Sequence, residues 1–404
     1  MNEESSDKSA LVPRLRFPEF LGAGEWEKKS LADVCLKITN GKANAEDHED
    51  DGVYPLYDRS EVVKKSSEYV FDDEAVIIPG EGMRFQPKYY KGKFNLHQRA
   101  YALMQHQGNA EFVYYTLDRF KDTLAKNAVK STVLSLRLPI IERFSLAVPD
   151  NSEQKKIADC LSSLDELIVA ETQKLDALKT HKKGLMQQLF PHEGETEPVC
   201  RFSTEGDWTV ASLPDVVFFQ EGPGIMAVDF CSEGVPLVRL AGVAGPAVTL
   251  DGCNYLEPEK VAQKWAHFRL ELDDLIISTS ATFGLSSIVT EVASGAVFYT
   301  GLIRFRPSNE RLSLGYLKTF LSSPCFARQA ESAAVGGGIK HFGPTHLKQM
   351  EIPVPPLAEQ QRISGCFTSL DDLITSQSQK IDALKTHKKG LMQQLFPVLD
   401  EVPA

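Results

Sequence analysis

One stretch of the sequence combines positive charge with side chains that can hydrogen-bond to bases. From Arg84 to Arg99 the chain reads RFQPKYYKGKFNLHQR, without an acidic residue. Cations contact DNA phosphates, whereas amide and imidazole groups can read base edges. The residues that we predict to contact DNA here are Arg84, Gln86, Lys88, Tyr89, Lys91, Lys93, His97, Gln98 and Arg99. The same pattern also fits a β-hairpin with a basic outer face and its aromatic side chains in the core.

A later region is polar but less basic. The segment DDLIISTSATFGLSSIV, from Asp273, is typical of two strands joined by a polar turn. A run of three glycines, 336–338, precedes a second polar group and could let a backbone approach phosphates. The candidates for DNA contact are Ser278, Thr279, Ser280, Thr282, Lys340 and His341. Core strands with a flexible connecting loop explain the region equally well, so these residues alone do not predict DNA binding.

The sequence offers no pattern for catalysis. It has no GxxxxGK[ST] phosphate loop, no GxSxG elbow and no HExxH metal motif. The acidic run 46–51 contains one histidine, and a solvated loop is its simpler interpretation than a cation site. Seven scattered cysteines form no CxxC pair. We therefore expect no catalytic residue, metal or cofactor in this chain.

Charge and the N-terminal sequence bound the possible classes of protein. The net charge of −11 argues against nucleic-acid binding if taken alone. Net charge is a sum over the chain, however, and a local basic patch can still bind DNA. The first ten residues are polar and lack an apolar signal core, and no run is long enough to span a membrane. Together with unpaired thiols, these features favour a cytoplasmic protein without membrane contact.

The chain repeats itself at an offset of 206 residues. Lys174–Pro191 reads KLDALKTHKKGLMQQLFP, and Lys380–Pro397 differs from it only by isoleucine for leucine at the second position. Upstream, Arg16-Phe17 and a following tryptophan are echoed by Arg201-Phe202 and another tryptophan. Between these echoes the two halves diverge; FNLHQRAYALMQ, from Phe94, has only a loose counterpart in AVFYTGLIRFRP. The pattern indicates duplication of one variable domain followed by one near-constant segment.

Each near-constant segment is predicted to be a long helix. Apolar positions recur with alternating steps of four and three, the a/d pattern of a coiled coil. The series runs through residues 157, 161, 164, 168, 171, 175, 178, 182, 185 and 189, and through 363, 367, 370, 374, 377, 381, 384, 388, 391 and 395. Residues 152–189 would span about 57 Å. An antiparallel pairing of the two helices would cover both stripes, and separate burial of each helix against its own domain is the alternative. Glu171, Gln377, Lys182 and Lys388, at seam positions, either fix the register or mark where the seam opens.

The exposed side chains of the repeated segment recur as faithfully as the apolar ones. Packing tolerates many apolar exchanges and places no demand on exposed positions. Two equal outer surfaces suit two copies of one partner protein. The predicted partner-binding residues are Lys179, His181, Lys183, Gln187, Lys385, His387, Lys389 and Gln393. A recent duplication without selection on the surface is the alternative.

These patterns predict a division of the chain into seven parts. In order they are a disordered tail over 1–13, a globular domain over 14–150, a long helix over 151–191, a linker over 192–200, a second globular domain over 201–355, a second long helix over 356–397 and a tail over 398–404.

The whole pattern resembles the specificity subunits of type I restriction–modification systems. The resemblance covers about residues 15–397 and is carried by the twofold layout and by the entries into the long helices, AVPDNSEQKKI and IPVPPLAEQQRI. The ending LKTHKKGLMQQLFP and the segments VIIPGEG, NLHQRAYAL and DDLIISTSATFG are similar to others that recur in the family. Asp150-Asn151 departs from Pro356-Leu357 of the second copy, which puts the entry geometry of the first helix in doubt.

The resemblance implies an α+β fold. Two mixed α/β target-recognition domains would be separated by two long antiparallel coiled-coil helices with pseudo-two-fold symmetry. It implies a non-catalytic subunit that binds double-stranded DNA and assembles with two methyltransferase subunits and with restriction subunits. S-adenosylmethionine, ATP and Mg²⁺ would belong to those partners, which would flip and methylate an adenine in each half-site.

We therefore expect the chain to recognise a bipartite, asymmetric target, with the helices setting the distance between half-sites to at most about 17 base pairs. A coiled-coil adaptor that joins proteins without touching DNA is the alternative class. A specificity subunit of a methylation-only phage-defence system is a close variant.

Overall fold

The protein divides into two compact units, which are described separately. The computed structural model describes residues 11–44, 46–130, 133–203, 205–279, 286–333 and 343–399. Unit 1 comprises Met1–Gln173 with Ser378–Ala404, and unit 2 comprises Lys174–Gln377. Both boundaries fall inside long helices, so each unit holds one globular domain and a part of both helices.

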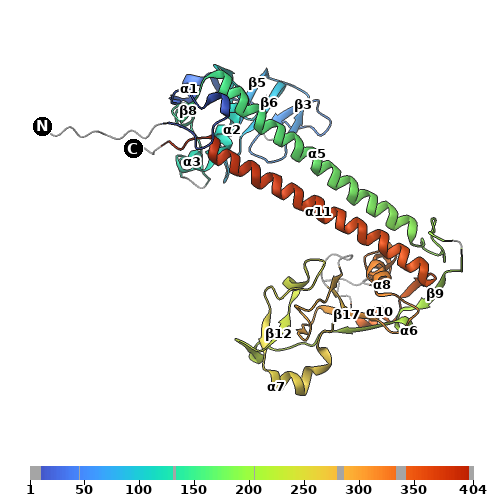
Figure 1. Ribbon diagram of the computed structural model, residues 1–404. Helices are drawn as coiled ribbons and strands as arrows, with labels where there is room; N and C mark the ends of the chain where they lie inside the picture. The colour runs from blue at the N-terminus through green and yellow to red at the C-terminus, as the bar shows by residue number, and fades with distance from the viewer. Residues whose placement is uncertain are drawn as a thin grey trace. The chain divides into compact units, whose positions relative to one another are not determined.

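Unit 1 is built on a six-stranded sheet with the order β2-β7-β5-β6-β3-β4, in which only β3 and β6 are parallel neighbours. Figure 1 labels β3, β5 and β6 of this sheet. Side chains of a strand alternate between its two faces. Val76 and Ile78 of β5 therefore join a core beneath α2, while Ala75 and Ile77 join a second core on the opposite face. The elements are η1 (Pro18–Phe20), β1 (Glu27–Ser30), α1 (Leu31–Val34), β2 (Cys35–Asn40), β3 (Tyr54–Tyr57), β4 (Lys64–Ser66), β5 (Phe71–Pro79), β6 (Lys88–Leu96), β7 (Ala100–His106), α2 (Ala110–Arg119), α3 (Lys121–Lys126), α4 (Leu138–Glu142) and β8 (Ser145–Val148).

Unit 2 repeats this plan with shorter strands. Its strands form two four-stranded sheets, β10-β17-β14-β15 and β11-β13-β12-β16, where β12 and β16 are parallel as β3 and β6 are in unit 1. The elements are β9 (Thr209–Ser212), α6 (Leu213–Val216), β10 (Val217–Glu221), η2 (Ala227–Asp229), β11 (Phe230–Cys231), β12 (Val235–Val238), η3 (Leu240–Val243), β13 (Asn254–Leu256), α7 (Pro258–Lys260), η4 (Val261–Trp265), η5 (Ala266–Phe268), β14 (Leu275–Ser278), β15 (Ser287–Ile288), β16 (Val297–Phe298), β17 (Leu302–Pro307), α8 (Leu314–Leu321), α9 (Pro324–Ala333), α10 (Pro344–Leu347) and β18 (Glu351–Val354).

Two long helices, α5 (Asn151–Leu189) and α11 (Leu357–Leu395), follow the globular domains. Asp150 caps α5, because its carboxylate accepts hydrogen bonds from the backbone N–H groups of Ser152 and Glu153 at 2.9 and 3.0 Å. Both helices end one residue before a Phe-Pro pair. Every position of the two predicted a/d series is buried or half-buried, so the heptad prediction is confirmed.

Ion pairs join the two helices in each unit, and in unit 1 the order of Asp165–Lys388 and Glu171–Lys380 along the helices shows that they run antiparallel. In unit 1, the Lys388 ammonium lies 2.6 Å from the Asp165 carboxylate. In unit 2, Lys182 lies 2.5 Å from Asp371. These pairs are equivalent, since both partners are related by the 206-residue offset. The seam lysines therefore fix the register, and antiparallel pairing, rather than separate burial of each helix, is what each unit contains.

A buried ion pair anchors the start of each long helix. The Arg16 guanidinium donates to both oxygens of Glu153 at 2.7 Å, and both side chains are almost fully buried. In unit 2, Arg201 pairs with Glu359 at 3.0 Å, and Trp208 Nε1 donates to the same carboxylate at 3.0 Å. These contacts explain why an arginine recurs ahead of each domain and, in unit 2, why a tryptophan follows it.

The glutamine that follows each of these glutamates ties the helix to its own domain. The amide oxygen of Gln154 accepts from the backbone N–H of Asn109 at 3.0 Å, and Asn109 caps α2. The amide oxygen of Gln360 accepts from the N–H of Ser313 at 2.8 Å, and Ser313 caps α8. The Glu-Gln entry of each helix thus fixes how the domain sits on it.

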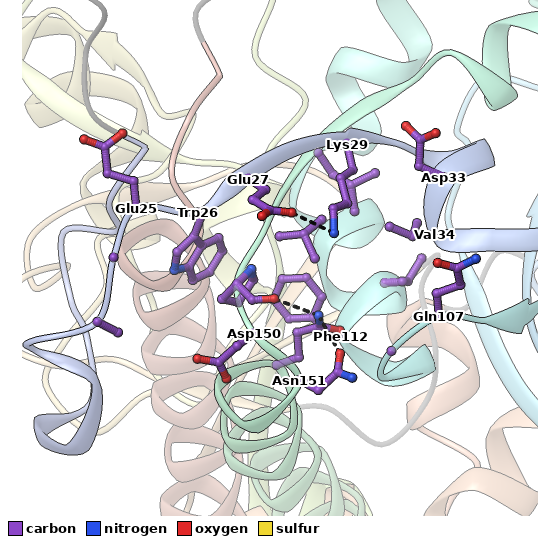
Figure 2. A pocket seen from close by; sticks show the side chains of 18 of the residues that line it. Glu25, Trp26, Glu27, Lys29, Asp33, Val34, Gln107, Phe112, Asp150 and Asn151 are labelled. Carbon is purple, nitrogen blue, oxygen red and sulfur yellow. Dashed lines mark hydrogen bonds and ion pairs between the residues drawn. The ribbon is translucent and has the colours of Figure 1, made fainter.

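A polar cleft of about 550 Å³ lies beside this junction in unit 1. Figure 2 shows Trp26 and Phe112 next to the first turn of α5, with Asp150 below the Trp26 ring and the Glu27–Lys29 ion pair above. The two rings meet edge to face with centroids 5.8 Å apart. Within the described ranges the buried Trp26 Nε1 has no hydrogen-bond partner, unlike its counterpart in unit 2.

The repeated helix ends pack into equivalent sites in the two units. Phe396, at the end of α11, packs against Phe112 of unit 1, with ring centroids 5.5 Å apart. Phe190, at the end of α5, stacks on Tyr316 of unit 2 at 5.8 Å. Each globular domain is thus closed by the helix end that follows the other domain in the sequence.

Candidate nucleic-acid interface

The turn between β6 and β7 brings three of the predicted DNA-contacting residues together. His97, Gln98 and Arg99 line a cleft of about 450 Å³. The other residues that line it come from the loop after β2, the end of β3 and the end of β5: Asn44, Glu46, Asp58, Arg59 and Glu81. The sequence did not point to Asn44 or Arg59.

Backbone hydrogen bonds hold this turn in place. The N–H of His97 donates to the carbonyl of Tyr57 at 2.9 Å, and the N–H of Gln98 donates to that of Ala43 at 2.9 Å. The carbonyl of Arg99 accepts from the N–H of Gly80 at 2.8 Å. Three strand ends that are distant in sequence therefore support one short turn.

The side chains of the turn also have defined partners. Gln98 Nε2 donates to Asn44 Oδ1 at 2.9 Å, and the backbone N–H of Arg99 donates to His97 Nδ1 at 3.1 Å. The Arg99 guanidinium lies 2.5 Å from Glu81, and this carboxylate raises the arginine pKa. Arg59 is exposed and makes no ion pair among the described residues.

His97 is a neutral hydrogen-bonding group in this setting. Partial burial lowers its pKa, an effect that nearby Asp58 opposes. Because Nδ1 accepts the Arg99 N–H, the ring proton is on Nε2. The turn therefore presents one imidazole donor and one amide, with two guanidinium groups alongside.

The preceding basic stretch divides into exposed and engaged side chains. Arg84, Lys91 and Lys93 are exposed. Gln86 is instead held between Asp118 and Lys121, with hydrogen bonds of 2.7 Å to each. Two further half-buried side chains bond within the domain: Lys88 donates to the carbonyl of Ser60 at 2.6 Å, and Tyr89 to Glu74 at 2.6 Å. Strand alternation does not account for this division, because Tyr89, Lys91 and Lys93 share one face of β6; the contacts with distant residues do.

Unit 2 has an equivalent turn with different side chains. Tyr299 N–H donates to the carbonyl of Val238 at 3.1 Å, as His97 does to Tyr57 in unit 1. Thr300 N–H donates to that of Pro223 at 3.2 Å, as Gln98 does to Ala43. Thr279 N–H donates to Gly301 at 2.9 Å, as Gly80 does to Arg99. The segment HQR in unit 1 thus corresponds to YTG in unit 2.

The predicted contacts of unit 2 are placed only in part. Ser278 is half-buried at the end of β14, and Thr279 is buried beside the turn, with its hydroxyl 3.2 Å from the carbonyl of Gly301. Ser280, Thr282, Lys340 and His341 lie outside the described residues. The most prominent cation at the turn is Arg239, whose guanidinium stacks over the Tyr299 ring at 4.2 Å.

The eight predicted partner-binding residues are all exposed. Lys179, His181, Lys183 and Gln187 belong to unit 2, and Lys385, His387, Lys389 and Gln393 belong to unit 1. Each unit therefore carries one copy of the same outer surface.

The described ranges contain no cluster of three or more histidine, cysteine or acidic side chains arranged to hold a metal ion. The acidic run 46–51 is exposed. Among the helices that are described, none has the length and apolar character needed to cross a membrane.

Comparison with known proteins identifies the family. Residues 23–180 and 205–386 match the type I restriction modification DNA specificity domain, so the chain belongs to this family. The family resemblance seen in the sequence is thereby confirmed, and the prediction of a non-catalytic subunit agrees with it.

Curated relatives match over most of their length. The type I restriction enzyme MjaVIII specificity subunit of Methanocaldococcus jannaschii is 24% identical, covering 95% of this chain and 93% of the relative. The EcoDI specificity subunit of Escherichia coli is also 24% identical, covering 84% and 80% of the two chains.

Solved structures share the fold at low sequence identity. The S subunit of a type I restriction–modification system from M. genitalium superposes with a TM-score of 0.64, at 14% identity and with coverage of 96% of this chain and all of that one. A chain from a study of type I complex assembly gives a TM-score of 0.57 at 14% identity, with coverage of 92% and 97%. The predicted fold class is confirmed.

Proposed function

We propose that this chain is the DNA-recognition subunit of a type I restriction–modification complex and that each globular domain binds one half of a bipartite double-stranded target. The observation that carries the proposal is the pair of equivalent turns, 97–99 and 299–301, which have the same backbone support and unlike side chains. The same backbone support with different side chains is expected for two related domains that bind different DNA sequences. The target would accordingly be asymmetric.

The exposed cations of the basic stretch in unit 1 supply phosphate contacts. Arg84, Lys91 and Lys93 are exposed; Lys91 lies 3.8 Å from Glu74, and Lys93 lies over the Tyr69 ring at 4.5 Å. Lys88, Gln86 and Tyr89 are half-buried, bond within the domain and act mainly by shaping its surface. In unit 2, Ser278 is the last residue of β14, and Thr279 follows it and bonds to the turn 299–301. Phosphate contacts would orient the domains, and groups at the turns would read bases.

The long helices set the spacing of the half-sites in this proposal. Each has 39 residues and is therefore about 58 Å long. That length corresponds to at most about 17 base pairs of B-DNA. The equivalent ion pairs Lys388–Asp165 and Lys182–Asp371 keep the helices in one register, which a fixed spacing requires.

The repeated outer surface binds two methyltransferase subunits, one at each unit. Its exposed lysine, histidine and glutamine side chains recur identically in the two copies, as expected for two contacts with one kind of partner. Restriction subunits would join this assembly, and S-adenosylmethionine, ATP and Mg²⁺ would be bound by the partner subunits. A methylation-only assembly would use the same two surfaces.

A charge-matched pair of variants tests DNA recognition in the assembled complex. The triple variant Arg84→Ala, Lys91→Ala, Lys93→Ala should lose DNA modification while retaining both methyltransferase subunits on gel filtration. The control removes three exposed lysines elsewhere in unit 1: Lys28, Lys155 and Lys156. Methylation by the first variant at the rate of the control would favour the adaptor class, in which the chain never touches DNA.

A second measurement concerns the chain alone. Its net charge of −11 opposes approach to DNA, so partner subunits should supply most of the favourable electrostatics. DNA affinity should rise strongly when the methyltransferase is added. Tight, sequence-specific binding by the isolated chain would contradict this part of the proposal.

A further inference from the structure

The cleft at the β6–β7 turn holds an amide in a geometry suited to one base. Gln98 donates one Nε2 hydrogen to Asn44 Oδ1 at 2.9 Å, and its backbone is fixed by the carbonyl of Ala43. The Gln98 side chain is exposed. Its amide oxygen and second Nε2 hydrogen therefore remain available side by side, and this acceptor–donor pair matches N6 and N7 of adenine in the major groove.

The groups around Gln98 also favour the edge of a purine base as the ligand. His97 presents an Nε2–H donor, because its Nδ1 is occupied by the Arg99 N–H at 3.1 Å. Arg59 lines the same cleft without an ion pair among the described residues. Purine edges in the major groove carry the N7 acceptor that such donors contact. Asp58 does not compete for Arg59, because its carboxylate pairs with Lys64 at 2.8 Å.

In unit 2 Thr300 is the residue equivalent to Gln98, but an arginine, Arg239, lies beside the equivalent turn at the position that Asp58 has in unit 1. Arg239 follows Val238, whose carbonyl supports the turn as Tyr57 does in unit 1. One guanidinium nitrogen donates to Asn254 Oδ1 at 2.7 Å, and the guanidinium lies over the Tyr299 ring at 4.2 Å. The guanidinium is planar, and its contacts with Asn254 and Tyr299 orient it, so its remaining N–H groups can make a bidentate contact with guanine O6 and N7.

We propose that Gln98 and Arg239 determine the sequence preference of the two half-sites: Gln98, positioned by Asn44, reads an adenine, and Arg239, positioned by Asn254 and Tyr299, reads a guanine. This inference rests on the proposed function. It adds the base class that each domain selects and the side chain that selects it.

The test uses the complex of the full chain with its methyltransferase subunit. Long-read sequencing of host DNA first gives the methylated motif of the unaltered complex. Binding is then measured on duplexes in which each base pair of that motif is changed in turn. Gln98→Ala should lower the preference for adenine at one position of one half-site on the order of tenfold or more, and Arg239→Ala should do the same for guanine in the other half-site.

Two conservative variants and two controls sharpen the result. Gln98→Glu should shift the preference at its position toward cytosine, whose N4 donates to a carboxylate, and Arg239→Lys should weaken discrimination because it cannot make a planar bidentate contact. Gln107→Ala, beyond the opposite end of β7, and Arg311→Ala, at an exposed loop of unit 2, should leave the motif unchanged.

The outcomes distinguish failure of this inference from failure of the proposed function. Unchanged discrimination in both Gln98 variants and both Arg239 variants would overturn the assignment, while the unaltered complex still recognised its target. An equal loss of affinity on every duplex would also overturn it, because that result identifies backbone contacts. If the unaltered complex showed no sequence preference at all, the proposed function itself would fail.

Discussion

The side chain of Gln154, in the first turn of α5, accepts a hydrogen bond from the backbone N–H of Asn109, the residue that caps α2. One amide therefore joins the start of the long helix to the helix that supports the sheet of unit 1. Gln360 and Ser313 repeat the arrangement in unit 2. Because both junctions are built from the same groups, the recognition domains are mounted on their helices in the same way.

The neighbouring ion pair should be a main source of stability in unit 1. Glu153→Ala leaves the buried Arg16 guanidinium without its carboxylate, and we expect a loss of about 3–5 kcal/mol in the free energy of unfolding. Chemical denaturation of the variant checks this. Asp159→Ala, which removes an exposed pair with Lys155, should cost at most about 1 kcal/mol. Similar losses in the two variants would show that burial of the Arg16–Glu153 pair is unimportant.

Truncation of the repeated phenylalanines should have crossed effects. Phe190 follows the first domain in sequence but packs in the core of unit 2, and Phe396 follows the second domain but packs in unit 1. Phe190→Ala should cost about 3–5 kcal/mol and raise amide hydrogen exchange around Tyr316. Phe396→Ala should do so around Phe112. Exchange that rose instead in the domain preceding each phenylalanine would contradict the packing described.

Stability of unit 1 should fall on mild acidification. Burial lowers the pKa of His106 below its ordinary value of 6.5, and its Nε2 has no partner in the described part of the chain. The unfolded chain therefore binds a proton that the folded unit resists, so this contribution is complete above pH 6.5 and is lost progressively as the pH drops below that value. Denaturation at pH 7.5 and 5.5 measures the effect. His106→Leu should reduce the difference; an unchanged difference would assign it to other groups.

The order of the elements along the chain should be open to permutation. The N–H of Leu15 donates to the carbonyl of Gln394 at 3.0 Å, just as the N–H of Cys200 donates to that of Gln188 at 2.9 Å. The end of α11 thus meets the entry to unit 1 as the end of α5 meets the entry to unit 2. A chain that joins residue 399 to residue 11 through a short linker and opens at Gly194 should fold, with a circular dichroism spectrum like that of the original. Failure to fold would mean that the connection 192–200 is needed for folding, and does more than join the two halves of the chain.

The helices were predictable because their signal is local and repeated. The a/d steps from Ile157 to Leu189 follow from the sequence alone, and so do the proline stops. The roles of Lys182 and Lys388 could not be predicted, because a heptad position does not reveal which residue of the partner helix faces it. Asp371 and Asp165 settle that question only once the register is known.

The recognition surface was predictable in part, for a related reason. A basic stretch can be read from the sequence, but contacts with distant residues decide which of its side chains are exposed. Gln86, for example, forms hydrogen bonds with Asp118 and Lys121. Asn44 and Arg59 reach the cleft through long-range strand pairing, which leaves no local signal. The loose match of FNLHQRAYALMQ with AVFYTGLIRFRP already places HQR opposite YTG, but it does not reveal the residues that pair with either turn.

The closing contacts of Phe190 and Phe396 have an evolutionary consequence. Each half of the gene encodes one globular domain together with the phenylalanine that packs into the core of the other domain. In a product of one half alone, the site for that phenylalanine in the globular domain would be empty. Only a second identical molecule could fill it. Such a half-length relative should therefore occur as a homodimer and select an inverted repeat in DNA, and fusion of two diverged copies would yield the non-palindromic reader.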